Sequence, residues 1–519
     1  MTVVEMLARN ARMYPEETAL VEIRANEKVR KEINWKQFNE RADRIANALI
    51  DRGVSKGDKV IHLLTNSINW LEVFFGILRT GAWVVPLNYR FNSRDIKYCA
   101  DIVEAKVMIL GEEFTERVEA IRPQLPTIKD YIFVGQPLPK DMEAYEDVIA
   151  NASAKPLEVE IADEDEAGVW FTSGTTGTPK GSLLTHKNLE SVAINHNVHY
   201  HIKHEDNKLL VMPLYHTGEC FIWFGNLIVG ARGTILVGIS PQYIFETVHN
   251  ERATIFVLMV PWVQDILGVL DRGELKKEEY DLSSWRATIF GAQPVPPSLI
   301  KRWKEYFPNM KFDNNYGLSE ASGPGCIYHD LDEEWDIASI GKAGFNWEAR
   351  LVNNRGEDVP QGEKGEIIVK GNGVMKGYYK NPEKTAETIK DGWLYTGDIA
   401  MMNSDGFFYI VDRKKDVVIS GGENIFPVEV EEVIHSHPKV KDVGVIGIPD
   451  ERLGEIAAAI IDPEAGITLT EEEIKDFCEQ NLPRYKRPRR IIFDKVPRNP
   501  TGKIEKPKLR QKYAGEKAE

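Results

Sequence analysis

The chain has 519 residues, of which 42% are hydrophobic, and a formal net charge of −15 at pH 7. This length predicts two or three domains, and the acidic balance without a basic domain argues against nucleic acid as the main partner. The four cysteines are too far apart for a zinc or redox pair, and neither a signal peptide nor an apolar run of membrane-spanning length is present, which predicts a cytoplasmic globular protein.

Apolar runs and helical periodicity alternate from residue 35 onwards. Apolar residues recur at helical spacing over residues 35–50, and a second helix is expected to begin at about Ser67. The expected strands are residues 59–64, 83–87, 107–110, 131–134 and 168–171. Strands that alternate with helices predict an α/β fold of parallel sheets covered on both faces. In such folds, ligands bind at the carboxyl ends of the strands.

The stretch from Thr172 to Gly181, TSGTTGTPKG, directly follows one of these strands. Its glycines let backbone N–H groups approach a ligand, and its hydroxyls and lysine add donors and charge, so it predicts a phosphate-binding loop. The Walker A pattern requires glycine before its lysine and a hydroxyl residue after it, whereas this loop has Pro179 and Gly181 there. The alternative is a Gly/Ser/Thr-rich linker, but a linker needs neither the Pro-Lys pair nor a preceding strand.

A short strand at 182–184 and a helix capped by Thr185 are expected next. The histidines at positions 196, 199, 201 and 204 can bind a metal or be hydrated residues of a helix or loop. We favour hydrated residues, because no cysteine or acidic partner lies among them in the sequence. A strand at 209–212 leads to the sequence Pro-Leu-Tyr-His, which places His216 at a strand end.

The second half of the chain begins with further αβ units and then becomes rich in strands. The αβ units are the strands 254–260, 286–290 and 311–313 and the helix 298–307. From about residue 340, strands at 348–352 and 366–370 are joined by Asn-Asn-Arg-Gly, a hairpin-like turn. A charged break at 411–416 precedes a compact α+β unit. This unit is expected to contain helices 427–435 and 471–479 and strands 444–448 and 457–461.

The order of the motifs resembles that of the adenylate-forming enzymes: acyl-CoA synthetases, peptide-synthetase adenylation domains and luciferases. The resemblance rests on the loop at 172–181, the Pro-Leu-Tyr-His sequence, Asn-Asn-Tyr-Gly-Leu-Ser-Glu at 314–320, Tyr-Thr-Gly-Asp at 395–398, Asp-Arg-Lys-Lys-Asp at 412–416 and Pro-Arg-Asn-Pro-Thr-Gly-Lys at 497–503. It spans nearly the whole chain. Serine stands at position 319 where threonine is usual, and it keeps the hydroxyl.

The resemblance implies an ATP-dependent carboxylate–CoA ligase that forms acyl-CoA, AMP and pyrophosphate through an acyl-adenylate. It implies ATP, Mg²⁺ and coenzyme A as cofactors and substrates. It also implies a large N-terminal domain of residues 1–412 with a β-rich subdomain at about 340–412, a hinge at 413–415, and a small mobile α+β domain of residues 416–519. By a rotation about the hinge, the mobile domain would bring Lys503 to the site for adenylate formation and the glycines near Gly422 to the site for the reaction with coenzyme A.

The resemblance also assigns individual residues. The implied catalytic residues are Lys503, Glu320, His216 and Thr175, and the implied metal ligands are Glu320 and Thr175. The implied nucleotide- and coenzyme-binding residues are Thr172, Ser173, Gly174, Thr175, Thr176, Gly177, Lys180, Gly291, Ala292, Gln293, Asn314, Asn315, Tyr316, Gly317, Ser319, Asp398, Arg413, Lys415, Ser420, Gly421, Gly422 and Lys503. Among them, Tyr316 is expected to stack on the purine, and Asp398 and Arg413 to bind the ribose.

Other activities remain open at this point. A P-loop ATPase or kinase is disfavoured by the broken Walker pattern, and a non-enzymatic relative is disfavoured by the presence of Glu320, Asp398, Arg413 and Lys503. Luciferase-like chemistry and acyl transfer to a carrier protein stay as alternatives. Trp223, Phe256, Trp262 and Tyr316 are the expected pocket walls and favour an aromatic, alicyclic or short-to-medium aliphatic acid. The sequence leaves open whether the chain is a monomer or a homodimer.

Overall fold

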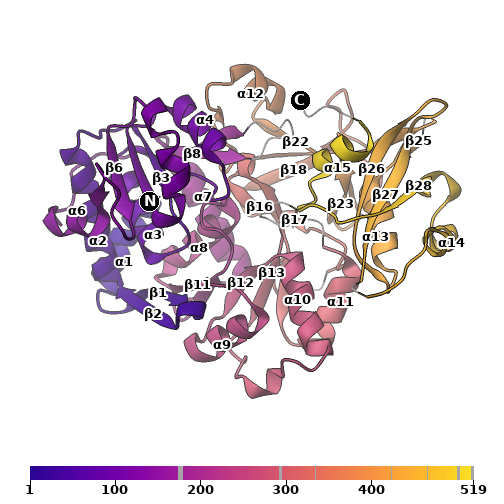
Figure 1. Ribbon diagram of the computed structural model, residues 1–519, viewed down its shortest axis with the longest axis horizontal. Coiled ribbons are helices and arrows are strands. Elements are labelled where there is room, and N and C mark those ends of the chain that lie inside the picture. Colours follow the sequence, from indigo (N-terminus) through magenta and orange to yellow (C-terminus); the bar gives the residue numbers. More distant parts are fainter. Residues whose placement is uncertain are drawn as a thin grey trace.

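The computed structural model describes residues 1–172, 179–291, 295–332, 335–421, 423–464, 466–498 and 503–515. Its elements form two large α/β layers, a central β-rich region and a separate sheet near the C-terminus (Figure 1). No helix among the described residues is long and apolar enough to cross a membrane.

The first large sheet has the strand order β20-β9-β8-β4-β3-β5-β6-β7. Its strands are β3 (Lys59–Leu63), β4 (Trp83–Pro86), β5 (Val107–Gly111), β6 (Asp130–Val134), β7 (Glu143–Ala144), β8 (Glu166–Thr172), β9 (Lys180–Thr185) and β20 (Gly377–Tyr378). The accompanying helices are α2 (Trp35–Asp51), α3 (Ile68–Arg79), α4 (Ser93–Val103), α5 (Thr115–Glu119) and α6 (Tyr145–Asn151). The predicted parallel pairing is confirmed from β8 to β7, whereas β9 and β20 add an antiparallel edge.

The second large sheet has the order β14-β13-β12-β10-β11-β1-β2. Its strands are β1 (Thr18–Arg24), β2 (Val29–Asn34), β10 (Asn207–Leu210), β11 (Arg232–Val237), β12 (Ile255–Leu258), β13 (Ala287–Phe290) and β14 (Lys311–Asn314). The accompanying helices are α1 (Val3–Met13), α7 (His186–Tyr200), α8 (Thr217–Val229), α9 (Pro241–Glu251), α10 (Val260–Asp271) and α11 (Pro297–Tyr306). All neighbouring pairs are parallel except β1 with β2.

The β-rich region and the C-terminal unit follow in the chain. The β-rich region contains β15 (Tyr316–Leu318), β16 (Gly323–Tyr328), β17 (Lys342–Ala343), β18 (Trp347–Val352), β19 (Gly365–Gly371), β21 (Ile389–Lys390), β22 (Trp393–Met402), β23 (Phe408–Arg413) and the helix α12 (Pro382–Thr388). The C-terminal unit contains β24 (Val418–Ser420), β25 (Glu423–Ile425), β26 (Val440–Asp450), β27 (Gly454–Pro463), β28 (Arg490–Phe493) and the helices α13 (Pro427–His435), α14 (Glu471–Asn481) and α15 (Lys506–Tyr513). The predicted antiparallel pairing of 348–352 with 366–370 is confirmed.

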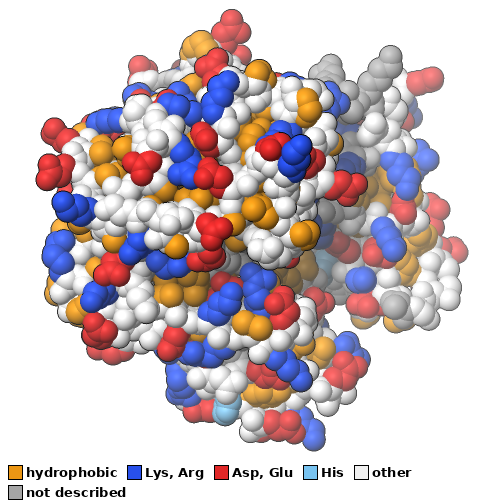
Figure 2. Space-filling view, turned by 60° about the vertical axis from the view of Figure 1, so that its left-hand side comes forward, with side chains coloured by type: hydrophobic (Ala, Val, Ile, Leu, Met, Phe, Trp, Pro, Cys, Tyr) orange, Lys and Arg blue, Asp and Glu red, His pale blue; other side chains and the backbone are white. Residues whose placement is uncertain are grey.

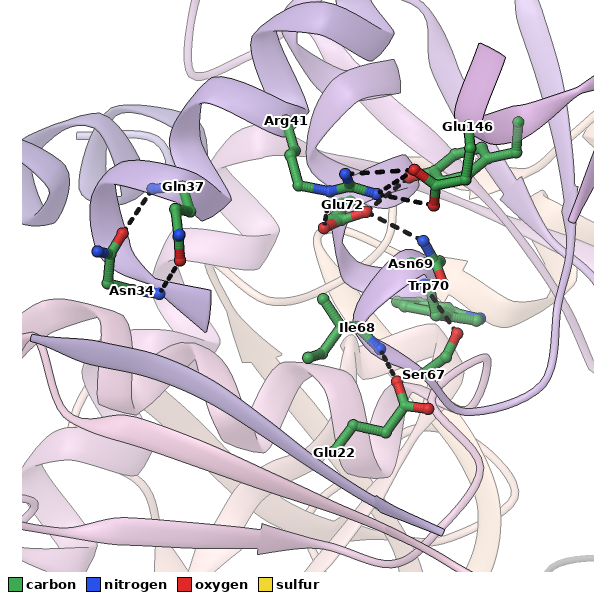
Figure 3. A network of polar contacts seen from close by, with 11 residues as sticks. Glu22, Asn34, Gln37, Arg41, Ser67, Ile68, Asn69, Trp70, Glu72 and Glu146 are labelled. Carbon is green, nitrogen blue, oxygen red and sulfur yellow. Dashed lines mark hydrogen bonds and ion pairs between the residues drawn. The ribbon is translucent and has the colours of Figure 1, made fainter. Parts of the chain in front are cut away.

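Local sequence signals explain several element boundaries. Asn34 caps α2 by a reciprocal pair of bonds with Gln37, which Figure 3 shows. Thr185 caps α7 as predicted, through a bond from the Asn188 backbone N–H to its hydroxyl. These capping boxes satisfy N–H groups that the first helical turn leaves without partners. They therefore fix where the helices between the strands begin.

A buried carboxylate joins helices α2, α3 and α6 on one side of the first sheet. Arg41 lies between Glu72 and Glu146 (Figure 3), and Glu72 also accepts a hydrogen bond of 2.7 Å from the Tyr145 hydroxyl. The Glu72 side chain is 1% exposed, whereas that of Glu146 is 70% exposed. Because burial makes a charge costly without its partners, Glu72 should matter much more than Glu146.

Replacing Glu72 with alanine is expected to lower the free energy of unfolding by about 3 kcal/mol, because Arg41 and Tyr145 lose a buried partner. Glu146→Ala removes the exposed partner of the same arginine and should cost less than about 1 kcal/mol. Urea denaturation of both variants measures the difference. Equal destabilisation by the two substitutions would contradict the role of Glu72 in joining these helices.

Candidate functional site

Three of the predicted nucleotide-binding residues meet in the β-rich region. The Tyr316 hydroxyl donates to Asp398 Oδ2 at 2.5 Å, and Arg413 Nε lies 2.9 Å from Asp398 Oδ1. Asp398 and Arg413 are register partners on β22 and β23, so sheet pairing places them side by side. Burial and the charge of Asp398 raise the pKa of Tyr316, which keeps its hydroxyl protonated as a donor.

Glu320 lies on a short 3₁₀ turn after β15, and one of its carboxylate oxygens is already bound. Tyr378 donates to Glu320 Oε1 at 2.7 Å. A carboxylate fits Mg²⁺, which takes oxygen ligands and is commonly held by one or two carboxylates together with substrate phosphates. The Lys180 ammonium lies 5.9 Å from the ring centroid of the same tyrosine.

Lys503 comes from the C-terminal unit and reaches the same site. The charges of Arg413, Asp398 and Glu320 act on its ammonium group. Burial and then the Arg413 charge lower the pKa of Lys503 to about 8, although the two carboxylates oppose this shift. The structure thus brings Lys503 together with residues that are distant from it in the sequence.

His216 adjoins Lys503 and is held in one neutral form. Its Nδ1 accepts a hydrogen bond of 3.0 Å from the Gly218 backbone N–H at the start of α8. Burial and the charge of Lys503 lower the pKa of His216 to about 4. Near neutral pH the ring is therefore uncharged, and because Nδ1 is the acceptor, Nε2 carries the proton and is the donor.

The loop that ends at His216 is held by two side chains that the sequence did not single out. Asn66 donates to Met212 O at 2.7 Å and accepts from Leu214 N–H at 2.8 Å. Glu219 accepts from Val211 N–H at 3.0 Å. Asn66 follows β3 and His216 follows β10, so this clamp joins the carboxyl ends of the two large sheets. No local pattern around Asn66 indicates this role, because its partners lie far along the chain.

The remaining predicted residues divide into two groups. Thr172 and Lys180 pair across β8 and β9, and Gly291, Gly317, Ser319, Lys415, Ser420 and Gly421 lie in the described structure. The side-chain amides of Asn314 and Asn315 turn to the interior, where they donate to Ser339 O and to the Tyr200 hydroxyl. Outside the described residues lie Ser173, Gly174, Thr175, Thr176, Gly177, Ala292, Gln293 and Gly422.

Two predicted pocket walls are wrong. Trp223 is fully buried in the core beside Phe38 and Phe75, and Phe256 is fully buried and stacked on Trp285 at 4.4 Å. An aromatic residue on a helix or strand of this kind fills a core. Their side chains therefore give no guide to the shape of an acyl group.

The interpretation of the histidines as hydrated is also wrong in part. His196 is fully buried and contacts the Tyr328 hydroxyl at 3.1 Å. His201 is exposed, but Asp330 and Asp332 lie beside it, with all three potential ligand atoms within 4.8 Å of one another. The acidic partners that appeared to be missing come from a distant part of the chain.

A cavity of about 540 Å³ lies elsewhere, over α2, α3 and β2. It is lined by charged and polar side chains, among them Glu22, Arg41, Asn69, Glu72 and Glu146, which Figure 3 labels. None of the predicted site residues lines it. Some of its acidic groups already accept hydrogen bonds within the protein: Glu22 accepts from the Ile68 N–H at the start of α3, at 2.8 Å.

Acidic and basic side chains are interspersed over the face of the molecule in Figure 2.

Comparison with known proteins decides the family. Residues 7–379 match the AMP-binding enzyme family, and residues 429–503 match the AMP-binding enzyme C-terminal domain. The chain belongs to the AMP-binding enzyme family. It is an AMP-forming acid–thiol ligase of the adenylate-forming fold, as its motifs predicted.

The relatives of this AMP-binding enzyme include ligases with different substrates. It is 34% identical to feruloyl-CoA synthase from Amycolatopsis sp over 514 residues, which cover 97% of this chain and 98% of the relative. It is 33% identical to the long-chain-fatty-acid–CoA ligase FadD13 from Mycobacterium tuberculosis, with 98% of each chain covered. The crystal structure of the anthranilate CoA ligase AuaEII in complex with anthranoyl-AMP matches with a TM-score of 0.90 and 27% identity, covering 99% of this chain and 97% of that chain.

The electrostatic environment of Lys503 can be tested by direct titration. We expect its pKa, measured by NMR of ¹³C-methylated lysines, to be about 8. Arg413→Gln should raise this pKa because it removes the neighbouring positive charge, and Asp398→Asn should lower it because it removes a negative charge. A Lys503 pKa that does not respond to either substitution would contradict the proximity of these groups.

Proposed function

We propose that the enzyme activates a carboxylic acid at this site in two steps. The acid's carboxylate oxygen forms a bond to the α-phosphorus of ATP, the bond from that phosphorus to the bridging oxygen breaks, and pyrophosphate leaves. The sulfur of coenzyme A then bonds to the acyl carbon, AMP leaves with the electron pair, and the thiol proton is released. The products are acyl-CoA, AMP and pyrophosphate.

The observation that carries the proposal is the position of Lys503 among Arg413, Asp398 and Glu320 and beside His216. The first step must bring two anions together, and a positioned cation between them stabilises the charge that develops. Lys503 is assigned this role. Asp398 and Arg413 are assigned to the ribose, Tyr316 to the purine, and the neutral His216 to a hydrogen bond from Nε2 near the acyl group.

The residues that would hold Mg²⁺ are Glu320, through the carboxylate oxygen to which Tyr378 does not donate, and Thr175. When bound, the ion neutralises phosphate charge and polarises the phosphoryl oxygens. Lys180 and the loop before it are assigned to the departing pyrophosphate. The Tyr378 hydroxyl keeps one oxygen of Glu320 occupied, which leaves the other for the metal.

A hinge at residues 413–415 would separate a domain of residues 1–412 from a mobile domain of residues 416–519. The support is that residues on the two sides of Lys415 bind to different parts of the structure. Lys414 N–H donates to Gly397 O at 2.9 Å and its ammonium pairs with Glu366, both in the β-rich region. Asp416 pairs with Arg510 on α15 at 2.7 Å. Lys415 lies between the two anchors, so rotation there can exchange Lys503 for the Ser420–Gly422 segment.

The substrate class is proposed from the relatives. Their names refer to a feruloyl group, a long-chain fatty acid, 2-succinylbenzoate and anthranilate, so an aromatic or aliphatic carboxylic acid is favoured. Measuring pyrophosphate release over a panel of such acids, with and without coenzyme A, identifies the substrate. Formation of ADP in place of AMP and pyrophosphate would contradict the proposed chemistry.

Lys503→Ala is expected to slow adenylate formation about 10²–10³-fold, the usual effect of losing one such donor. Conversion of a supplied acyl-adenylate to acyl-CoA should stay largely intact, because the second step does not need this cation. Lys508→Ala is the matched control, since it removes an exposed lysine from α15 in the same unit. Equal loss of both half-reactions in Lys503→Ala would refute the assignment.

A further inference from the structure

A short segment links Glu320 to the strand that follows the phosphate-binding loop. Met375 N–H donates to Glu320 O at 2.8 Å, and Lys376 N–H donates to Leu183 O at 2.9 Å. Strand β20 then pairs with β9, with Gly377 opposite Leu183 and Tyr378 opposite Ser182. One piece of backbone therefore contacts both the metal-ligand candidate and the strand that begins at Lys180.

The Tyr378 side chain also contacts both Glu320 and Lys180. Its hydroxyl donates to Glu320 Oε1 at 2.7 Å. Its ring lies 5.9 Å from the Lys180 ammonium. The phenol is half-buried, so these contacts are made in a partly desolvated environment, where hydrogen bonds to a charged group are comparatively strong.

Helix α12 contacts the backbone of this tyrosine and of the glycine before it. Tyr378 N–H donates to the Thr385 hydroxyl at 2.9 Å. Gly377 has a φ of +152°, and a Cβ at this position would lie 2.7 Å from Thr385 Cγ2, so only glycine allows the close approach. Backbone, helix and side chain thus fix the phenol in one position.

We propose that Tyr378 is a positioning residue for metal binding in this enzyme. It holds Glu320 through Oε1, so that Oε2 faces the Mg²⁺ of bound MgATP, and it sets the position of this carboxylate relative to Lys180. The inference rests on the proposed function, because it takes Glu320 as the metal ligand. It adds a residue from a segment distant in sequence from both groups.

The test uses Tyr378→Phe, which removes only the hydroxyl. Calorimetric titration with ATP at increasing Mg²⁺ concentrations is done without the acid, so the readout is binding and not turnover. The Mg²⁺ concentration that gives half of the maximal ATP binding should rise about tenfold, the effect of losing one hydrogen bond to a charged group. The melting temperature of the ligand-free protein should change little.

Tyr409→Phe is the matched control. The Tyr409 hydroxyl also contacts a carboxylate, Asp336 at 3.3 Å, but on an exposed part of the β-rich region. Its loss should leave the Mg²⁺ dependence of ATP binding unchanged. A similar rise in both variants would show that the Tyr378 effect is not specific and would overturn the inference.

Glu320→Ala separates failure of the inference from failure of the proposed function. If this variant binds ATP with the normal Mg²⁺ dependence, the assignment of Glu320 as a metal ligand is wrong, and the inference fails with it. If Glu320→Ala needs more Mg²⁺ while Tyr378→Phe does not, the metal ligand stands and the positioning role of Tyr378 is refuted. A lower melting temperature with normal Mg²⁺ dependence in Tyr378→Phe assigns that residue to stability alone.

Discussion

The site depends on holding two cations, Lys503 and Arg413, near each other against their repulsion. Arg413 lowers the pKa of Lys503, and the carboxylates of Asp398 and Glu320 offset this effect. Such an arrangement favours an anionic ligand, because a polyphosphate supplies the negative charge that the protein only partly provides. In the proposed mechanism, the loss of pyrophosphate removes part of this compensation, which would favour departure of Lys503 before the second step.

Three of the four groups are held by connections within the part of the chain that precedes the proposed hinge. Sheet pairing of β22 with β23 sets Asp398 against Arg413, and the segment that carries Tyr378 fastens Glu320 to β9. These connections are backbone ladders and side-chain bonds within one packed body. Lys503 instead belongs to a unit with its own core of residues such as Val430, Val445 and Ile461. The role proposed for Lys503 is thereby placed on a different unit from the residues assigned to the nucleotide.

The sequence predicted those features whose signals are local. Helix α13 is expected at its observed bounds, and Thr185 is expected as a cap, because periodicity and capping depend on residues that are neighbours in the sequence. Asn66 and Tyr378 were missed because their partners lie far away in the chain. Trp223 was misplaced because an aromatic residue on a helix has the same pattern whether it lines a pocket or fills a core.

The contacts between the two proposed domains are weak enough to be exchanged. Lys364 pairs with Glu429 at 2.8 Å, but both side chains are partly exposed, and Gln264 meets His435 at 3.3 Å. A partly exposed ion pair such as Lys364–Glu429 contributes about 0–1 kcal/mol, far less than a buried pair such as that of Glu72. The buried contact of Asp412 with Val428 N–H lies close to Lys415, where a rotation displaces atoms least. The contact beside Lys415 is thus buried and those farther from it are partly buried or partly exposed, an arrangement that fits the proposed rotation about residues 413–415.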